Sequence, residues 1–364
     1  MASGSQLLAC MQPTARSGEY GDDTSARSLP IESPTRVGAW EEWQGISHAA
    51  PFLAPAFFEI TERLLGTDRT LLLGARNGDA RALLPLIRHG HELVALRSDQ
   101  SPRFDMVGDP EALPLLWKEL VADKSWRSMC LDGVSEESPL VRVLPELARS
   151  DGFHVVVQPT SRAPYFLLDG FEDRLDKEFR RQLRKRAKKI PDLNFERITT
   201  YDAEAVHDLF RLESSGWKEC EGTSIASSNA TTRFYGELIV ELARTGQLSL
   251  CFLRSGDKRI AVQLAAETEH TCYLLKTGYD PEFQKQGAGH LVVYHFALDA
   301  LARGRTEIDL CGTECDSKRC WTDLTHQRVQ VRIYRNDVLG TLAYAARHIV
   351  RPKLGRIRRA LTRD

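Results

Sequence analysis

Residues 272–296, CYLLKTGYDPEFQKQGAGHLVVYHF, join a strand-like run to a helix-like run through a loop that contains two glycines. The apolar start is typical of a buried strand, which we expect to cover residues 271–278. Gly278-Tyr279-Asp280-Pro281 is typical of a turn. The apolar run that follows the glycines predicts a helix over 290–302. The segment between strand and helix is therefore either an ordinary turn or a cradle for phosphate groups.

The loop itself reads Gln284-Lys285-Gln286-Gly287-Ala288-Gly289. Glycine has no Cβ, so the backbone can approach a ligand closely. The first N–H groups of the helix that follows have no partner inside that helix, and together with the helix dipole they favour a bound anion. The loop has neither the G-K-[ST] end of a P-loop nor the G-x-G-x-x-G spacing of a dinucleotide site, so neither class is predicted.

A similar order of elements occurs in both halves of the chain. In the second half we expect strand 194–198, helices 202–218 and 231–245, strands 247–254, 259–268 and 271–278, helix 290–302 and strand 306–310. In the first half we expect two helical pieces after Thr35, strands 70–75, 80–88 and 92–96, helix 110–122, strand 128–131, helix 138–151 and strand 153–158. The prediction is a mixed α/β fold, an α+β mixed sheet, with two tandem units that each have a mainly antiparallel twisted sheet flanked by helices.

The expected organisation has five parts. They are a disordered leader (1–33), a first unit (34–168), a basic connector helix (169–192), a second unit (193–340) and a basic C-terminal tail (341–364).

Positive charge is concentrated in two segments, although the formal net charge of the chain is −1. Residues 174–190 contain nine Lys/Arg and two Asp/Glu, a local net of +7. Residues 346–364 contain seven Lys/Arg and one Asp, a local net of +6. The near-neutral total predicts no general attraction to DNA.

The basic segment 174–190 has the pattern of a helix with one narrow apolar stripe. The stripe consists of Leu175, Phe179, Leu183 and Ala187. One interpretation is a connector helix that docks by this stripe. The other is a surface that faces an acidic carrier protein, a nucleic acid or a polyanionic substrate.

The eight cysteines are not preceded by a secretory signal, which favours reduced thiols and a cytoplasmic location. Cys311, Cys315 and Cys320 have the spacing C-x3-C-x4-C, with His326 nearby. A paired C-x2-C knuckle is missing, so no metal site is predicted. No apolar run approaches the roughly 20 residues that span a bilayer.

The spacing Q-x-x-G-x-G at Gln284–Gly289 resembles the pyrophosphate loop of the GNAT acyltransferase superfamily. Further segments extend the resemblance in order: KEFRRQLRKRAKK (177–189), LESSGWKECEGTSI (212–225) and IDLCGTECDSKRCWTD (308–323). From about residue 171 to 336 the chain is similar to double-GNAT acyltransferases of the BioF2-like or CelD-like group, which is associated with cellulose biosynthesis. These are distant relatives of the Fem-type peptidoglycan peptidyltransferases. The first half resembles a degenerate first GNAT unit more loosely, with SPRFDMVGDP (101–110) in place of a family aspartate segment.

The resemblance implies acyl-CoA, acetyl-CoA or longer, as the donor substrate. The backbone amides of Gly287 and Gly289 would hold the pyrophosphate, and strand 271–278 would pair with the pantetheine. A break at Gly278 would separate this strand from the next one and make room for the thioester. The predicted cofactor-binding residues are Leu275, Lys276, Thr277, Gln284, Gln286, Gly287, Ala288, Gly289 and His290.

Acyl transfer to an amine needs a deprotonated amine, a polarised carbonyl and a proton for the leaving thiolate. Glu267 is the predicted base, with a surface carboxylate as the alternative. Asp309 is predicted either to face the reaction cleft or to cap the loop that follows it. Lys318 is predicted to hold an anionic acceptor group or to stabilise charge at the thioester. Tyr279 is the predicted proton donor to the thiolate.

Three residues are predicted to order the acceptor: Trp217, Lys218 and Trp321. For Trp217 and Lys218 the alternative is a helix end packed on the core. Cys315 as a nucleophile is disfavoured, because GNAT-type enzymes usually transfer the acyl group directly.

The predicted function is biosynthetic N-acyl transfer from acyl-CoA to a small-molecule amine by direct attack. One alternative is an acyl carrier protein, docked on 174–190, or an aminoacyl-tRNA as the donor. Another is a non-catalytic assembly or membrane-surface module that uses the basic tail, although Pro352 and Gly355 interrupt its amphipathic pattern. A homodimer stays open, and the sequence does not encode which amine is accepted.

Overall fold

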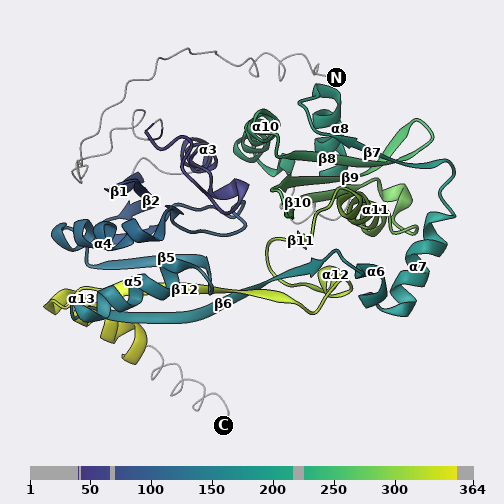
Figure 1. Ribbon diagram of the computed structural model, residues 1–364. Coiled ribbons are helices and arrows are strands. Elements are labelled where there is room, and N and C mark those ends of the chain that lie inside the picture. The colour runs from purple at the N-terminus through teal and green to yellow at the C-terminus, as the bar shows by residue number, and fades with distance from the viewer. Residues whose placement is uncertain (1–39, 41, 66–69, 216–224, 351–364) are drawn as a thin grey trace, which may run out of the picture.

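The computed structural model describes residue 40 and residues 42–65, 70–215 and 225–350, which form two sheet-centred units side by side (Figure 1). The first unit contains, in chain order, η1 (Pro51–Leu53), α3 (Pro55–Leu65), β1 (Thr70–Asn77), β2 (Ala80–His89), β3 (Glu92–Ala95), β4 (Val107–Gly108), η2 (Pro110–Ala112), α4 (Leu113–Ala122), β5 (Ser128–Ser135), α5 (Pro139–Ser150) and β6 (His154–Leu167). The rest of the described chain contains α6 (Phe171–Arg174), α7 (Lys177–Ala187), β7 (Leu193–Ile198), α8 (Ala203–Glu213), η3 (Ile225–Ser227), α10 (Asn229–Arg244), β8 (Leu248–Ser255), β9 (Lys258–Glu267), β10 (Thr271–Tyr279), η4 (Pro281–Phe283), α11 (Ala288–Ala302), β11 (Glu307–Asp309), α12 (Asp316–Arg319), β12 (Thr325–Tyr334), α13 (Val338–Ala345) and η5 (Ala346–Val350).

The predicted mixed α/β fold with two tandem units is confirmed. The strands form one mixed sheet in the order β1-β2-β3-β5-β12-β6-β11-β10-β9-β8-β7, and β4 pairs with β2. Most neighbours are antiparallel, but each half contains one parallel pair, β3 with β5 and β10 with β11. The two halves therefore repeat one arrangement of strands.

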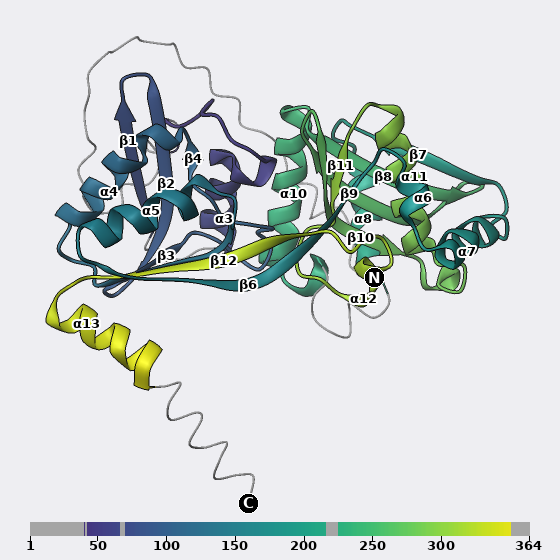
Figure 2. The same ribbon diagram turned by 60° about the horizontal axis from the view of Figure 1, so that its bottom comes forward.

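The last strand of the chain returns to the first unit. β12 lies between β5 and β6, and its ladder with β6 runs from Thr325 opposite Pro164 to Tyr334 opposite His154. The end of β6 pairs with β11 in the second unit. Figure 2 shows β6 and β12 running together from one unit to the other. Each unit is therefore completed by a strand from the opposite half of the chain, an exchange that the sequence analysis did not predict.

The two units also share apolar contacts on a different side of the molecule. Phe57 on α3 packs edge-to-face against Phe234 on α10, with ring centroids 5.6 Å apart. Phe52 makes the same kind of contact with Tyr273 on β10 at 4.9 Å. These rings belong to one buried cluster that contains residues of both units. Burial of this shared apolar surface holds the units together.

The basic helix docks by its apolar stripe, as one of the two interpretations predicted. Leu175 and Leu183 are buried, and Phe179 and Ala187 pack against the same cluster as the apolar residues of α11. The side chain of Asp176 caps the N-terminus of α7 by accepting from the backbone amides of Glu178 and Phe179. α7 is thereby fixed beside α11.

The expected leader (1–33) and residues 351–364 of the basic tail lie outside the described residues. Within the described residues, no helix has the length and apolar character needed to cross a bilayer.

The strand exchange predicts that a cavity in β12 weakens both units. Ile333 is fully buried, opposite Met129 of β5 and Val155 of β6. Ile333→Ala should lower the free energy of unfolding by about 2–5 kcal/mol, measured by urea denaturation. Hydrogen exchange should show that β2 and β9 lose protection together.

Leu342→Ala, at a side chain that is 57% exposed on α13, is the control and should change stability by less than about 0.5 kcal/mol. Faster exchange in Ile333→Ala that stays confined to the first unit would contradict the interlocked arrangement.

Candidate active site

Strands β10 and β11 separate soon after they begin to pair. Thr271–Tyr273 lie opposite Glu307–Asp309, and no further pair follows among the described residues. β10 continues to Tyr279 and has a bulge between Leu274 and Lys276. The opening therefore begins after Tyr273, and the prediction that Gly278 marks it is wrong. Gly278 instead packs against α8, where an added Cβ would lie 2.5 Å from the Cα atom of Glu213.

A pocket of about 620 Å³ occupies this opening. Its walls come from β10, the glycine loop, α11, the loop after β11, α12 and α7. The predicted residues that line it are Leu275, Lys276, Thr277, Tyr279, Gln284, Gly287, Ala288, Gly289, His290, Lys318 and Trp321. The predicted residues Gln286, Glu267 and Asp309 are not part of the lining. Trp217 and Lys218 lie outside the described residues.

The glycine loop presents bare backbone to the pocket. Gly287, the N-cap of α11, is in the left-handed region with φ 66°. A Cβ on Gly287 would lie 2.9 Å from Nη1 of Arg186, and one on Gly289 would lie 2.9 Å from the Tyr279 ring. In the described part of the chain, the amides of Ala288 and Gly289 donate to no protein acceptor. Two amide donors at the positive end of a helix thus face the pocket.

Arg186 on α7 stands opposite this loop, and the sequence analysis did not single it out. Other arginines of α7 have carboxylate partners: Arg180 pairs with Asp173, Arg181 with Glu178 and Arg184 with Glu172. Arg186 lines the pocket, and within the described residues its guanidinium makes no hydrogen bond or ion pair. Its charge is therefore available to an anion at the glycine loop.

A tight loop after β11 forms another wall of the pocket. Cys311 and Gly312 have φ angles of 51° and 55°, and such angles are strained for a cysteine. Asp309 Oδ1 accepts from the Cys311 amide at 2.7 Å. The Lys318 ammonium donates to the carbonyls of Cys311 and Thr313. Asp309 thus has the capping position that was one of its two predicted roles, and Lys318 holds the same loop from the other side.

Comparisons with known proteins identify this architecture. Residues 177–319 match the family model described as an acetyltransferase (GNAT) domain. The chain therefore contains a GNAT-type acyltransferase domain. This confirms the predicted enzyme class over a non-catalytic module. In a search of curated proteins, none matches the sequence.

Solved structures with low sequence identity share the GNAT acyltransferase's fold. FemX is 13% identical with a TM-score of 0.55, over 84% of this chain and 96% of its own. A conserved protein of unknown function from Bacteroides thetaiotaomicron is 13% identical with a TM-score of 0.54, over 85% and 99%. L-PGS from Bacillus licheniformis is 13% identical with a TM-score of 0.51, over 88% and 98%. At this identity the similarity shows the fold.

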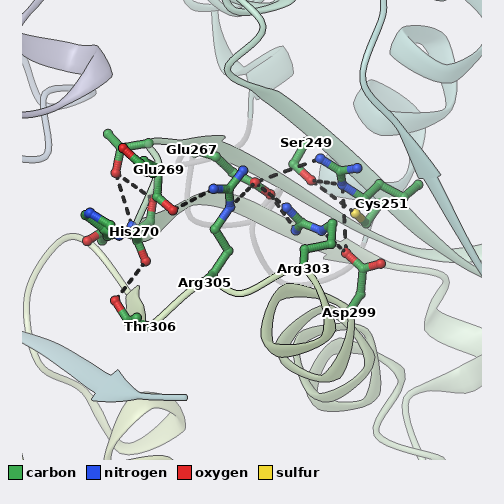
Figure 3. A network of polar contacts seen from close by, with 12 residues as sticks. Ser249, Cys251, Glu267, Glu269, His270, Asp299, Arg303, Arg305 and Thr306 are labelled. Atoms are coloured by element: carbon green, nitrogen blue, oxygen red, sulfur yellow. Dashed lines mark hydrogen bonds and ion pairs between the residues drawn. The ribbon is translucent and has the colours of Figure 1, made fainter. Parts of the chain in front are cut away.

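Glu267 does not have the surroundings of a base in this GNAT acyltransferase. Its buried carboxylate accepts from Arg303 at 2.6 and 2.8 Å and from Arg305 at 3.2 Å, and Arg197 lies 3.8 Å away. Figure 3 shows Arg303 and Arg305 reaching Glu267 from the end of α11 and the loop after it. Burial raises the pKa of Glu267, but the hydrogen bonds and charge of Arg303, together with Ser249 and Arg197, lower it by more, so its pKa lies below the ordinary value. We therefore assign Glu267 to an ion network that stabilises the fold.

Tyr279 lines the pocket beside the glycine loop, where a Cβ on Gly289 would lie 2.9 Å from its ring. Lys276 lines the pocket, but its Nζ atom lies 3.7 Å from the buried carboxylate of Glu213 and 5.1 Å from the centre of the Tyr235 ring. Proton donation by Tyr279 stays a prediction, and Lys276 forms part of a buried charge pair.

The aromatic wall of the pocket is tightly packed. Trp321 is 5% exposed, stacks on Phe166 at 5.7 Å and meets the edge of Phe179 at 5.3 Å. Burial lowers the pKa of His290, so this ring is neutral at pH 7. The acceptor role of Trp321 stays a prediction.

The thiols of the site do not form a metal cluster or a disulfide among the described residues. Burial raises the pKa of the Cys311 thiol well above its ordinary value, which makes it a poor nucleophile. His326 stacks on Tyr165 with ring centroids 3.9 Å apart. This packing accounts for the position of the histidine that had suggested a metal ligand.

The ion network predicts a loss of stability when Glu267 is neutralised. Glu267→Gln should lower the free energy of unfolding by about 2–4 kcal/mol, since two arginines lose their shared carboxylate and are themselves only partly exposed. Urea denaturation at pH 7 measures this loss. Glu269→Gln, at an exposed side chain close by, is the control and should have little effect.

The same substitution has a defined pH dependence. The pKa of Glu267 is lower in the folded chain than its ordinary value of 4.5, so its ionised form stabilises the fold above that value. The stability gap between the parent and Glu267→Gln should be constant at neutral pH. It should shrink as the pH falls below 4.5 and through the folded pKa. A gap that widens on acidification would contradict the assignment.

Proposed function

We propose that this acyltransferase takes its acyl group from acyl-CoA and passes it to an amine by direct attack. The observation that carries the proposal is the placement of Arg186 against the glycine loop. An arginine with no hydrogen-bond or ion-pair partner among the described residues faces two open amides at the start of α11, in a pocket that leads into the gap between β10 and β11. A phosphate ester at one end of an extended chain fits this arrangement.

The parts of acyl-CoA match successive parts of the pocket. The pyrophosphate would lie at Gly287, Ala288 and Gly289, where amide donors, the helix dipole and Arg186 favour negative charge. The pantetheine would follow β10, whose edge on the β11 side has no strand partner after Tyr273 in the part of the chain that the structure describes. The thioester would then lie toward the Cys311–Gly312 loop.

Direct transfer needs no covalent intermediate on the protein. The neutral amine nitrogen forms a bond to the thioester carbon, the carbon–sulfur bond breaks, and the proton lost by nitrogen balances the one gained by the departing thiol. Burial keeps the Cys311 thiol protonated, so it does not compete for the acyl group. The free cysteines of the described residues support a cytoplasmic location for the reaction.

Calorimetric titration with acetyl-CoA and longer acyl-CoAs tests the donor. The parent protein should bind at least one of them, and Gly289→Val should bind none, because the added side chain collides with the Tyr279 ring and fills the cradle. If no acyl-CoA binds the parent, the donor proposal fails. Transfer from an acyl carrier protein or aminoacyl-tRNA, sensitive to charge reversal at Arg181, Arg184 and Lys188, would then replace it.

Arg186→Gln tests the phosphate contact separately. Loss of a charge-assisted hydrogen bond should weaken acetyl-CoA binding about 10- to 100-fold. Acetyl-pantetheine, which lacks the pyrophosphate, should bind parent and variant equally. Arg181→Gln is the matched control, since Arg181 is on the same helix but is exposed and paired with Glu178. Equal weakening by both substitutions would indicate a general effect of helix charge.

A further inference from the structure

A second polar cluster combines residues from both units and adjoins the Cys311–Gly312 loop. Arg103 and Asp105 belong to the segment that precedes β4 in the first unit. Asp309 ends β11, and Arg328 comes from the exchanged strand β12. Of these four, only Asp309 is among the site residues predicted from the sequence, and the acyl transfer proposed above uses none of the other three.

Arg328 is buried without the acceptors that its guanidinium requires. Its side chain is 4% exposed, and its closest carboxylate oxygen, Oδ2 of Asp309, is 3.7 Å from Nη2, beyond hydrogen-bond distance. Within the described residues, Nε and Nη1 of Arg328 have no hydrogen-bond partner. Burial lowers the pKa of Arg328, and the charge of Arg103 lowers it further. A buried cation with open donors is costly unless something else supplies acceptors.

Arg103 adds a second guanidinium with open donors. It lies over the ring of Phe52, 5.5 Å from its centre, and makes no hydrogen bond or ion pair among the described residues. Its Nε atom is buried without a partner. Arg103 is only partly buried, so this side of the cluster can be reached by a ligand. Phe52 also contacts Tyr273, which pairs with Asp309 across β10 and β11.

Asp105 brings a carboxyl group to the same place. The Ser138 hydroxyl donates to its Oδ1 atom at 2.6 Å, and so does the amide of Met106 at 2.9 Å. Burial raises the pKa of Asp105, while the charges of Arg103 and Arg328 act in the opposite direction. The cluster therefore combines two guanidiniums with two carboxyl groups.

The cluster adjoins the donor pocket at one residue. Cys311 lines that pocket, and its backbone amide donates to Asp309. The charges of Asp309, Arg328 and Arg103 all act on its thiol. A molecule held by the arginines would thus lie across the Cys311–Gly312 loop from the thioester.

We propose that Arg103 and Arg328 bind the acid group of the acceptor, which is an amine that also carries a carboxylate, of the amino-acid type. This inference rests on the proposed acyl transfer. Guanidinium groups match the planar, bidentate geometry of a carboxylate. The carboxyl groups of Asp105 and Asp309 bind the ammonium group of the acceptor. Each charged group of a zwitterion is thus next to a group of opposite charge in the cluster. An amine that lacks a carboxylate would leave the guanidinium donors without acceptors. We therefore expect the site to reject it.

The test compares matched acceptors with acetyl-CoA, or the longer acyl-CoA that calorimetry selects, as the donor. The twenty standard L-amino acids and their α-carboxamides are offered in pairs, and the released CoA thiol is measured. At least one acid should be accepted with kcat/KM about tenfold or more above its amide. Arg103→Met should raise KM for that acid about 10- to 100-fold, remove the preference over the amide, and leave the affinity for the donor unchanged.

Arg97→Met is the control, because Arg97 lies in the same unit but is paired with Asp132 at 2.7 Å. It should keep the preference for the acid. Arg328→Met should act as Arg103→Met does. If the variant at the buried Arg328 does not fold, the variant at the partly buried Arg103 is sufficient for the test.

Equal use of acids and amides, preference for the amides, or no transfer to any acid of the panel would overturn the inference. The acyl-CoA titration separates the two proposals. A protein that binds acyl-CoA but ignores the acid group disproves only the acceptor assignment, whereas one that binds no acyl-CoA disproves the donor.

Discussion

The ladder between β6 and β12 is the constraint on which both sides of the site depend. β6 pairs with β12 from His154 to Pro164 and with β11 from Tyr165 to Leu167. One strand therefore fixes β11, which supplies Asp309, and β12, which supplies Arg328. Backbone hydrogen bonds set this register, and a slip of one residue would turn Arg328 to the opposite face of the sheet. The strand exchange thus positions side chains from distant parts of the chain without any direct bond between them.

Two buried charge clusters near the site differ in how completely they are satisfied. Around Glu267, each carboxylate oxygen has an arginine donor, and the arginines also reach Asp299 and backbone oxygens. Around Arg328, the donors have no acceptor of suitable geometry among the described residues. A network in which every donor has an acceptor stabilises a fold. Buried donors without a protein acceptor indicate a place where a ligand supplies the acceptor. This contrast assigns the first cluster to structure and the second to binding.

Local patterns in the sequence predicted most elements and the glycine-loop side of the pocket. The glycine loop, the strand before it and the helix after it lie within 272–296, so their chemistry can be read from neighbouring residues. The apolar stripe of α7 could also be predicted, because residues four apart in a helix lie on the same face. β12 was not predicted as a strand, although Val329, Val331 and Ile333 alternate in the manner of one. The alternation predicts a strand, but the residues near β12 in the sequence do not determine that it pairs with strands of the first unit.

The site residues that the sequence misassigned depend on partners far along the chain. Glu267 occupies a plausible position for a base, but Arg303 and Arg305 occupy its carboxylate. Arg186 is one cation in a run of nine, and only the fold shows that it lacks the carboxylate partners of Arg181 and Arg184. Arg103 and Arg328 are arginines, a residue type that is usually exposed, so burial could not be foreseen. Pairing and burial are properties of the tertiary structure, and a single sequence does not record them.

The short loop at Cys311 and Gly312 lies where the pocket and the arginine cluster meet, so its position affects both. Its left-handed backbone is strained at Cys311, and Asp309 and Lys318 hold it from opposite sides. The loop lines the pocket and neighbours the arginine cluster at the same time. In the proposed reaction, a shift of this loop would change the distance between the thioester and the acceptor amine, to which a reaction between two bound molecules is most sensitive. Asp309 and Lys318 maintain the strained backbone of this loop. We therefore infer that the loop contributes to the proposed transfer by its position and not by the chemistry of its own side chains.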